Sequence, residues 1–274
     1  MENNLDFTKL KQELKIRGYS KRTIETYPYY NQTFLQFCKK SPLQITTQDV
    51  KNYLEFLIDK GRSRATIRLV YNSLLFYYSQ VLRKNIMKNI MIPKKDQKIT
   101  VGLTKEEVAH LICAIKNPKH RLLVELIYAS GIRAQEAVKI KVKDILIEER
   151  LIVVRAGKGN KDRKTILSKQ FIKDFQGELN KEKYLFEGRS GHLTTRSVQE
   201  IIKTAAKKAG IKKRVYPHLL RHAFATHLHQ SKVDVRYIQK LLGHKDQKTT
   251  ESYVSVIEDE FKNINSPHDQ LYSK

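Results

Sequence analysis

The helical periodicity of the chain stops within residues 83–100, and this break constrains the fold more than any other feature. The stretch RKNIMKNIMIPKKDQKIT contains Pro93 and is rich in lysine and asparagine. Its latter part is typical of a linker between domains. A chain of 274 residues also exceeds what one small core usually needs. We therefore expect two domains, residues 1–92 and 101–274, joined by a linker over 93–100.

The first domain is expected to be a compact bundle of four or five helices. Apolar residues recur near the helical period over residues 1–92, and N-cap residues stand before the expected helices, as at Ser20 and Ser63. Pro28 falls inside one of these helices and is expected to kink or split it.

The second domain is expected to combine helices with a small β-sheet. Thr104 and Glu107 form a capping-box pattern at its start. The segments ILIEERLIVVR and KTILS have the composition of short strands, and helix is expected to resume from Ser168. The predicted fold class is therefore mainly α with a small β-sheet, an α+β fold.

The charge and the cysteine content limit partners and compartment. Lysine and arginine number 53 against 28 acidic residues, a net charge of +25, which favours a polyanionic partner. No long apolar run and no signal-peptide pattern is present, so we expect a cytoplasmic protein without a membrane segment. The two cysteines exclude a disulfide framework and are expected to be buried free thiols, with no zinc site.

The first of four polar clusters is ASGIRAQEAVKI, which follows an apolar helix. Gly131 is expected to end that helix and to place Arg133 at the start of the next element. There, backbone N–H groups and a guanidinium can face a phosphate together. The alternative is a solvated arginine paired with Glu136.

The second cluster is the turn GKGNKDR between the two expected strands. It carries Lys158, Lys161 and Arg163, and its glycines permit close backbone approach, so the hairpin can enter a nucleic-acid groove. The spacing of a nucleotide-binding P-loop is absent. A plain polar β-turn is the alternative.

The third cluster lies in YPHLLRHAFATHLHQ, where His218 and Arg221 are three positions apart and share a helix face. Metal binding by the histidines is the alternative, disfavoured because no acid joins them on one face. His222 and His227 are expected to pack or to form hydrogen bonds.

The fourth cluster is LGHKDQKTTESYV. Gly243 ends a short amphipathic helix, His244 follows at its exit, and Tyr253 comes nine positions later. On its own this is an ordinary surface tyrosine in a chain that has 14 of them.

Taken together, the polar residues of the four clusters match the catalytic set of the tyrosine recombinases in type, order and spacing. They are Arg133, Lys158, His218, Arg221, His244 and Tyr253. The chain resembles the Xer-type branch of that family over roughly residues 100–262, and more weakly over 1–92, where YSKRTIETY is similar to the family's core-binding domain. Gln135, where the family usually has a small residue, and Pro28 depart from the pattern.

The resemblance implies a site-specific DNA recombinase that works through a 3′-phosphotyrosine, and the residue types suit that chemistry. The expected roles are a phosphate clamp at Arg133 and Arg221, a further donor at His244, a general base at His218, a general acid at Lys158 and the nucleophile at Tyr253. Glu136 is expected to orient Arg133 or His218. Phosphate contacts are expected at Lys161, Arg163 and Arg196. Because the cations supply the positive charge, no metal or cofactor is required.

The resemblance also implies the assembly. Two domains clamp double-stranded DNA, and four protomers exchange strands at two recombination sites through a Holliday junction. The free protein is expected to be a monomer or dimer, and the tail over 255–274 to dock on a neighbouring protomer. Chromosome-dimer resolution, integration and excision all stay open, as does an activating accessory protein. The alternatives are a nicking-closing enzyme like a type IB topoisomerase and a non-catalytic DNA-binding regulator.

Overall fold

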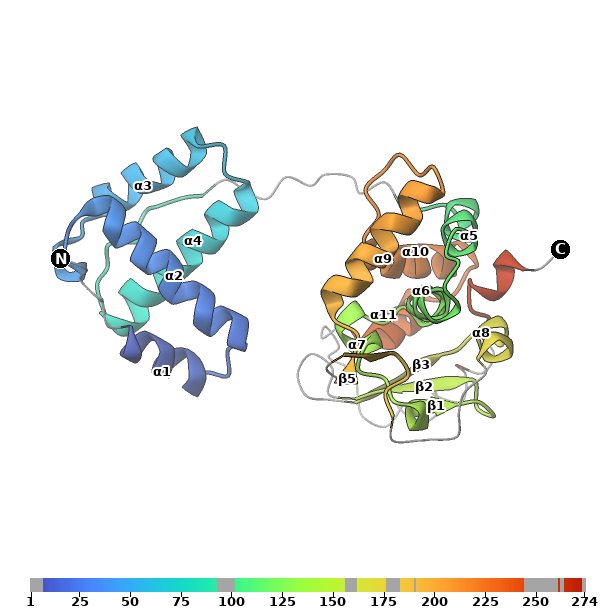
Figure 1. The fold of residues 1–274 in the computed structure, drawn as a ribbon. Coiled ribbons are helices and arrows are strands. Elements are labelled where there is room, and N and C mark those ends of the chain that lie inside the picture. Colours follow the sequence, from blue (N-terminus) through green and yellow to red (C-terminus); the bar gives the residue numbers. More distant parts are fainter. Residues whose placement is uncertain are drawn as a thin grey trace. The chain divides into compact units, whose positions relative to one another are not determined.

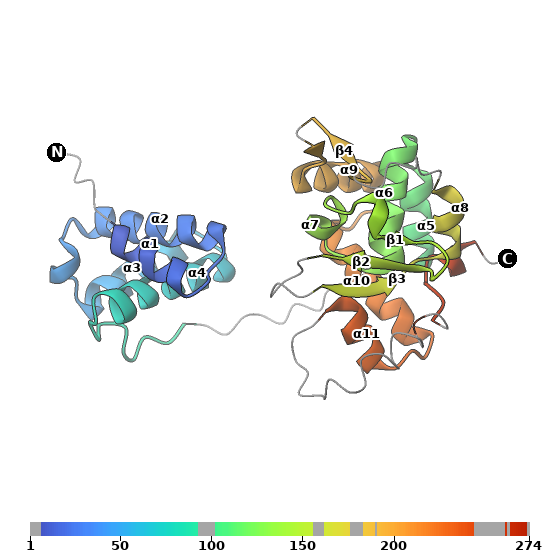
Figure 2. The same ribbon diagram turned by 90° about the horizontal axis from the view of Figure 1, so that it is seen from below.

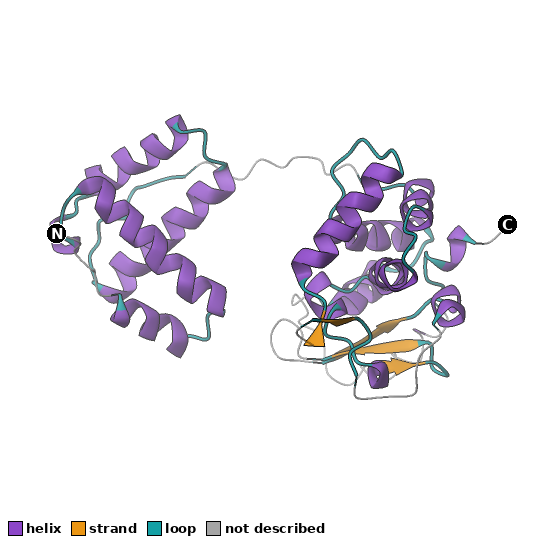
Figure 3. Cartoon of the chain, viewed as in Figure 1, coloured by secondary structure: helices purple, strands orange, loops and turns teal. Residues whose placement is uncertain are grey.

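The chain folds into two units, Met1–Ile99 and Thr100–Lys274, each with its own hydrophobic core (Figure 1). The computed structural model describes residues 7–92, 102–155, 162–175, 183–189, 191–243, 261 and 264–272. Within these residues both units consist mainly of helices, and strands occur only in the second unit (Figure 3). The expected fold class, mainly α with a small sheet, is confirmed.

The described part of the first unit contains four helices and two short turns. The helices are α1 (Thr8–Ile16), α2 (Lys21–Cys38), α3 (Thr47–Asp59) and α4 (Arg64–Phe76), and the turns are a 3₁₀ turn, η1 (Pro42–Gln44), and a π-helical turn, η2 (Tyr77–Val81). The expected N-caps are confirmed, because the hydroxyls of Ser20 and Ser63 accept hydrogen bonds from the backbone N–H groups of Thr23 and Thr66.

The sequence predicts that Pro28 kinks or splits its helix, and the structure shows that it does not split α2. The helix runs unbroken from Lys21 to Cys38, and Pro28 is buried within it. One turn beyond the proline, the buried side chain of Asn31 donates hydrogen bonds to the carbonyl and hydroxyl oxygens of Ser73 on α4, at 3.2 and 2.8 Å. Packing against α4 offsets the backbone hydrogen bond that a proline removes.

The second unit packs its helices around α6 (Pro118–Ser130), of which the stretch Leu123–Ser130 is entirely buried. Figure 1 shows α6 end-on among its neighbours. The other helices are α5 (Lys105–Cys113), α7 (Ala134–Ala137), α8 (Lys169–Asp174), α9 (Thr195–Lys208), α10 (Pro217–Gln230) and α11 (Val235–Leu242). None of the described helices combines the length and apolar character that a membrane span requires.

A three-stranded antiparallel sheet borders this helical core. Its strands, in spatial order, are β1 (Ile145–Leu146), β2 (Leu151–Val154) and β3 (Arg163–Ile166), in the segments predicted from the sequence. A short 3₁₀ turn, η3 (Val142–Asp144), leads into β1. β3 lies next to both α6 and α11, so the sheet joins elements that are distant in the chain (Figure 2).

A second strand pair, β4 (Glu187–Gly188) and β5 (Gly191–His192), corrects the expectation of helices after Ser168 that are interrupted only by breaks, the first of them at Gly191. Each strand has two residues, which is too short for any alternating pattern to appear in the sequence. Gly188 allows the pair to close, because a Cβ there would lie 2.7 Å from the carbonyl oxygen of His192.

The prediction for His227 is confirmed, whereas the prediction for the two cysteines is wrong. His227 is a buried hydrogen-bonding residue, as expected: its Nδ1 lies 2.8 Å from the Tyr128 hydroxyl and its Nε2 lies 3.0 Å from the Leu103 carbonyl oxygen. Both cysteines are free thiols, but Cys113 is exposed and Cys38 is half-buried. The expectation of two buried thiols is therefore wrong.

The described part of the C-terminal segment, 264–272, packs on its own unit and ends in a 3₁₀ turn, η6 (Asp269–Leu271). The Ser266 hydroxyl donates to the Ala129 carbonyl at the end of α6, at 2.7 Å. His268 is fully buried, with its Nδ1 2.7 Å from the Ser168 hydroxyl. Asp269 accepts a hydrogen bond from the backbone of α8. The expected docking on a neighbouring protomer concerns the assembled protein; in the single chain this segment contacts its own domain.

Gly131→Ala is expected to destabilise the protein by roughly 2–5 kcal/mol, because the site combines a strained backbone with a steric clash. Gly131 has φ +63°, and a Cβ there would lie 2.4 Å from the ring of Phe224. Gly210→Ala is the matched control, since Gly210 has φ +69° but nothing within 4 Å of the added Cβ. Urea unfolding measures both. Equal losses of unfolding free energy in the two variants would show that the close approach of α6 and α10 contributes nothing to stability.

Candidate active site

Arg133 lies where α6 ends and α7 begins. Gly131 terminates α6 in the left-handed conformation, and the close contact with Phe224 sets this turn against α10. Arg133 then caps α7, and its backbone N–H and its Nη1 both donate to the carboxylate of Glu136, each at 2.8 Å. The expected helix break and the expected start of the next element at Arg133 are both present.

Glu136 is the centre of a cluster of arginines. Besides Arg133, it accepts two hydrogen bonds from Arg163, Nη1 to Oε1 at 3.1 Å and Nη2 to Oε2 at 2.8 Å. The Nη1 atom of Arg221 lies 4.0 Å from Oε2. One carboxylate therefore organises three guanidinium groups from α7, β3 and α10.

The charge state of Glu136 follows from this arrangement. Burial alone raises the pKa of the carboxyl group, but the hydrogen bonds from Arg163 and Arg133 outweigh it and lower the pKa to about 2. Glu136 is therefore ionised throughout the neutral range, and it partly neutralises a strongly cationic site.

Arg221 is the most buried cation of the cluster, with 3% of its surface exposed. Its Nη1 donates to the Gly131 carbonyl at 2.7 Å and its Nη2 donates to the Leu242 carbonyl at 2.6 Å. Burial and the neighbouring Arg133 lower the pKa of Arg221 to about 10, against the opposing effect of Glu136. The guanidinium remains charged at neutral pH while it holds the ends of two helices.

His218 stands on the same helix as Arg221, three residues earlier, as the sequence predicted. The residue is exposed at the surface of α10. Desolvation and the positive charges of Arg221 and Arg133 lower its pKa below the ordinary histidine value. The imidazole is therefore neutral at pH 7, the state in which one ring nitrogen can accept a proton.

The structure brings together only part of the residues predicted for the site. Arg133, Glu136, Arg163, Arg221 and His218 interact with one another through the bonds and charges given above. Arg196 is exposed in the first turn of α9, a helix that packs against α7. The predicted residues Lys158, Lys161, His244 and Tyr253 lie outside the described residues.

Arg163 occupies a position that the sequence did not suggest. It was expected to contact DNA phosphates, yet only 12% of its side chain is exposed and its guanidinium is bonded to Glu136 and to the Leu241 carbonyl. The turn sequence alone gives no signal for this, because the partners come from α7 and α11, far away in the chain.

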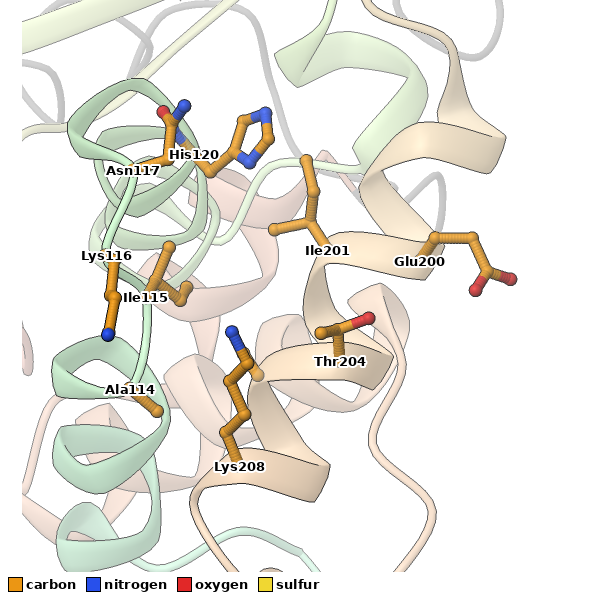
Figure 4. A pocket seen from close by; sticks show the side chains of 10 residues that line it. Ala114, Ile115, Lys116, Asn117, His120, Glu200, Ile201, Thr204 and Lys208 are labelled. Atoms are coloured by element: carbon orange, nitrogen blue, oxygen red, sulfur yellow. The ribbon is translucent and has the colours of Figure 1, made fainter.

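A metal site and a surface hollow are two other features that could mark a functional site. No group of three or more histidine, cysteine or acidic side chains suited to a metal ion occurs among the described residues. A hollow of about 410 Å³ lies between the α5–α6 connection and α9, with Ile115 and Ile201 inside it and Lys116 and Lys208 at its rim (Figure 4). None of the predicted site residues lines it.

Two family models match the chain in the same two regions. The Phage integrase family matches residues 102–260, more than half of the chain. The Phage integrase, N-terminal SAM-like domain, matches residues 7–88.

Whole-length relatives agree with the family models. Tyrosine recombinase XerA of Pyrococcus furiosus is 36% identical over 253 residues, which are 89% of this chain and 86% of the relative. Tyrosine recombinase XerD of Oceanobacillus iheyensis is 31% identical over 274 residues, covering 90% of this chain and 92% of the relative.

Solved structures share the fold. The crystal structure of XerA recombinase aligns over 93% of this chain and 92% of its own, with 28% identity and a TM-score of 0.50. A λ integrase dimer bound to a COC′ core site aligns over 89% and 97%, with 21% identity and a TM-score of 0.72. The family match, the relatives and the clustered arginines agree with one another: this chain belongs to the phage integrase family and is a site-specific tyrosine recombinase of the Xer-like branch.

Proposed function

We propose that this recombinase cuts and rejoins double-stranded DNA at specific sites through a 3′-phosphotyrosine at Tyr253, and exchanges strands between two duplexes through a Holliday junction. The observation that carries the proposal is the convergence of Arg133 and Arg221 on the carboxylate of Glu136, beside the neutral, exposed His218. Such a cluster suits the binding of one phosphate group and the removal of one proton.

The cleavage step begins when the phenol oxygen of Tyr253 attacks the phosphorus atom. His218 takes the phenolic proton, a bond forms between the tyrosine oxygen and phosphorus, and the bond from phosphorus to the 5′ oxygen breaks. Lys158 gives a proton to that leaving oxygen. The new ester keeps the energy of the old one, so attack by the 5′ hydroxyl of another strand restores the phosphodiester without ATP.

The arginines stabilise the charge that develops on the non-bridging oxygens. Arg221 uses one N–H of each terminal nitrogen for the Gly131 and Leu242 carbonyls, and each of these nitrogens carries a second N–H. Arg133 is more accessible, with 30% of its side chain exposed. Arg221 therefore forms the rigid half of the clamp and Arg133 the accessible half, with His244 as a further donor.

The wider assignments follow the family. We propose a core-binding domain over residues 1–92, a linker over 93–100, and a catalytic domain over 101–274 that ends in an interaction tail. Lys161 and Arg196 contact phosphates and set affinity rather than sequence choice. Four protomers act on two sites in the cytoplasm, assembled from monomers or dimers.

Cleavage is expected to fall on acidification with a midpoint below pH 6.5, the ordinary histidine value. A lowered pKa means that His218 keeps its neutral, proton-accepting form to a lower pH, and the rate is lost only as pH falls through that lowered value. Single-turnover adduct formation between pH 5 and pH 8 measures the profile. The exposed His229 supplies the control, since His229→Gln is expected to leave the midpoint unchanged. A midpoint above 6.5 in the wild type would exclude His218 as the base.

The test of the function starts from randomly nicked genomic fragments of the organism that carries the gene. The protein is incubated with these fragments and denatured in detergent, and DNA that remains covalently attached is sequenced. A nick near the cut prevents religation, so cleavage intermediates accumulate. We expect adducts at one or a few related sequences.

Two duplexes of different length that contain the captured sequence then test strand exchange. Recombinant products of intermediate length support the proposal. Adducts and relaxation of supercoiled DNA without exchange would indicate a topoisomerase, and binding without any adduct would indicate a regulator. Adding an extract of the source cells to the exchange reaction reveals whether an accessory protein is needed.

A further inference from the structure

Arg163 is the first residue of β3, and all of its guanidinium nitrogens are engaged by the protein. Its Nη1 and Nη2 form a two-point contact with the Glu136 carboxylate. Its Nε donates to the Leu241 carbonyl oxygen at 3.2 Å. With 12% of the side chain exposed, little of this arginine is accessible to a DNA backbone.

The aliphatic part of Arg163 packs across the end of α11. A Cβ at Gly243 would lie 2.8 Å from its Cδ and 3.0 Å from its Nε. Gly243 therefore serves two purposes: it takes the left-handed conformation that ends α11 (φ +64°), and it leaves room for the arginine stem.

Two arginines cap the same helix end from different elements. Arg163 of β3 binds the Leu241 carbonyl, and Arg221 of α10 binds the Leu242 carbonyl. The last carbonyls of a helix lack partners within it and carry the negative end of its dipole, so both cations are favourable there. The position of α11 therefore depends on both Arg163, from β3, and Arg221, from α10.

Arg163 also fixes the plane of the carboxylate that Arg133 depends on. A two-point contact between a guanidinium and a carboxylate defines their relative orientation, which a single hydrogen bond does not. Without Arg163, Glu136 would keep its contacts with Arg133 and the distant contact of 4.0 Å with Arg221. The carboxylate would then lose two of its four hydrogen bonds from the arginines, and its hold on the accessible half of the clamp would weaken.

We infer that Arg163 is a positioning residue of the recombinase: it holds the Glu136 carboxylate and the end of α11, so that Arg133 and Arg221 keep the geometry for cleavage, and it does not bind DNA. The inference rests on the proposed clamp roles of Arg133 and Arg221. It differs from the phosphate contact expected from the turn sequence, and the two assignments predict different measurements.

The first measurement is DNA affinity, determined with a random-sequence duplex over a series of salt concentrations. Arg163→Gln is expected to keep the wild-type affinity and salt dependence within error. Arg196→Gln, at an exposed position, is the matched comparison. It is expected to weaken binding and to reduce the salt slope by about 1, as the loss of one phosphate contact does.

The second measurement is single-turnover adduct formation on the captured duplex at saturating protein. Arg163→Gln is expected to lower the rate by about 10–100-fold, the usual effect of removing a residue that orients a catalytic group. Arg163→Lys keeps the charge but loses the two-point contact, so an intermediate rate is expected. Arg214→Gln, at an exposed position between α9 and α10 and outside the arginine cluster, is expected to cleave at the wild-type rate.

Two readouts separate positioning from a general loss of structure. The double variant Arg163→Gln/Glu136→Gln is expected to cleave no more slowly than the slower single variant, because both changes remove the same interaction. In Arg163→Gln the Glu136 carboxyl loses a hydrogen-bond donor that lowers its pKa, so cleavage is expected to acquire an additional loss on the acid side. If Arg163→Gln does not fold, Arg163→Lys carries all four measurements.

Two results would contradict the positioning role of Arg163. Weakened, less salt-dependent binding of Arg163→Gln with normal cleavage at saturation would make Arg163 a phosphate contact after all. Additive rate losses in the double variant would also overturn it. Absence of any adduct with the wild type would instead reject the proposed function, and the salt series would still decide whether Arg163 contacts DNA.

Discussion

Tyr253→Phe is expected to form no covalent DNA adduct while binding the same duplex as tightly as the wild type. Because Tyr253 is the proposed nucleophile, removing its phenol oxygen removes the atom that would form the bond to phosphorus. Loss of a covalent nucleophile typically costs at least about 10⁴-fold in rate. Adduct formation on the captured, nicked duplex is measured by the shift of protein in a denaturing gel, and affinity by a native shift.

Tyr272→Phe is the matched control, because Tyr272 is another tyrosine near the C-terminal end and is about half exposed. It is expected to form adducts at the wild-type rate. Residual adducts in Tyr253→Phe that disappear in Tyr272→Phe would show that the nucleophile has been assigned to the wrong tyrosine.

Arg221→Ala and Arg133→Ala are expected to differ in stability although both lose cleavage. Each removes a proposed donor to the phosphate, and the loss of such a donor typically costs about 10²–10³-fold in rate. Arg221 is 3% exposed, and its removal leaves the Gly131 and Leu242 carbonyls without this donor, so roughly 3–5 kcal/mol of stability is expected to be lost. The side chain of Arg133 is 30% exposed, and the expected loss is about 1 kcal/mol or less.

Urea unfolding and single-turnover cleavage measure the two effects separately. Arg214→Ala serves as the control, because Arg214 is an exposed arginine between α9 and α10 and lies outside the arginine cluster. It is expected to change neither quantity appreciably. Equal stability losses for Arg133→Ala and Arg221→Ala would contradict the division of the clamp into a rigid and an accessible half.

Local signals in the sequence predicted the elements well. Ser20, Ser63 and Thr104 each cap a helix where expected, and Gly131 ends α6 as its residue type suggests. Such features depend on neighbours within a few positions, so a single sequence carries them. Pro28 shows the limit, because packing between α2 and α4 decides whether a proline interrupts a helix.

The candidate site likewise combines local features that the sequence predicts with distant contacts that it does not predict. His218 and Arg221 share one helix, and their spacing alone placed them on one face. The pair of Arg133 and Glu136, three positions apart, was also predicted. The same carboxylate interacts with Arg163 and Arg221 from two other elements, and no local pattern reports those distant partners. The resemblance to a family supplied the residue set, but it did not distinguish a contact to DNA from a contact within the protein.

The C-terminal segment held by Ser266, His268 and Asp269 has a consequence for assembly. A tail that packs on its own domain competes with any tail offered by another copy, at an effective concentration on the order of millimolar. If protomers exchange these ends, free molecules at micromolar concentration will almost never do so. Protomers bound side by side on one duplex reach comparable local concentrations, so binding to DNA would promote the exchange of tails between them.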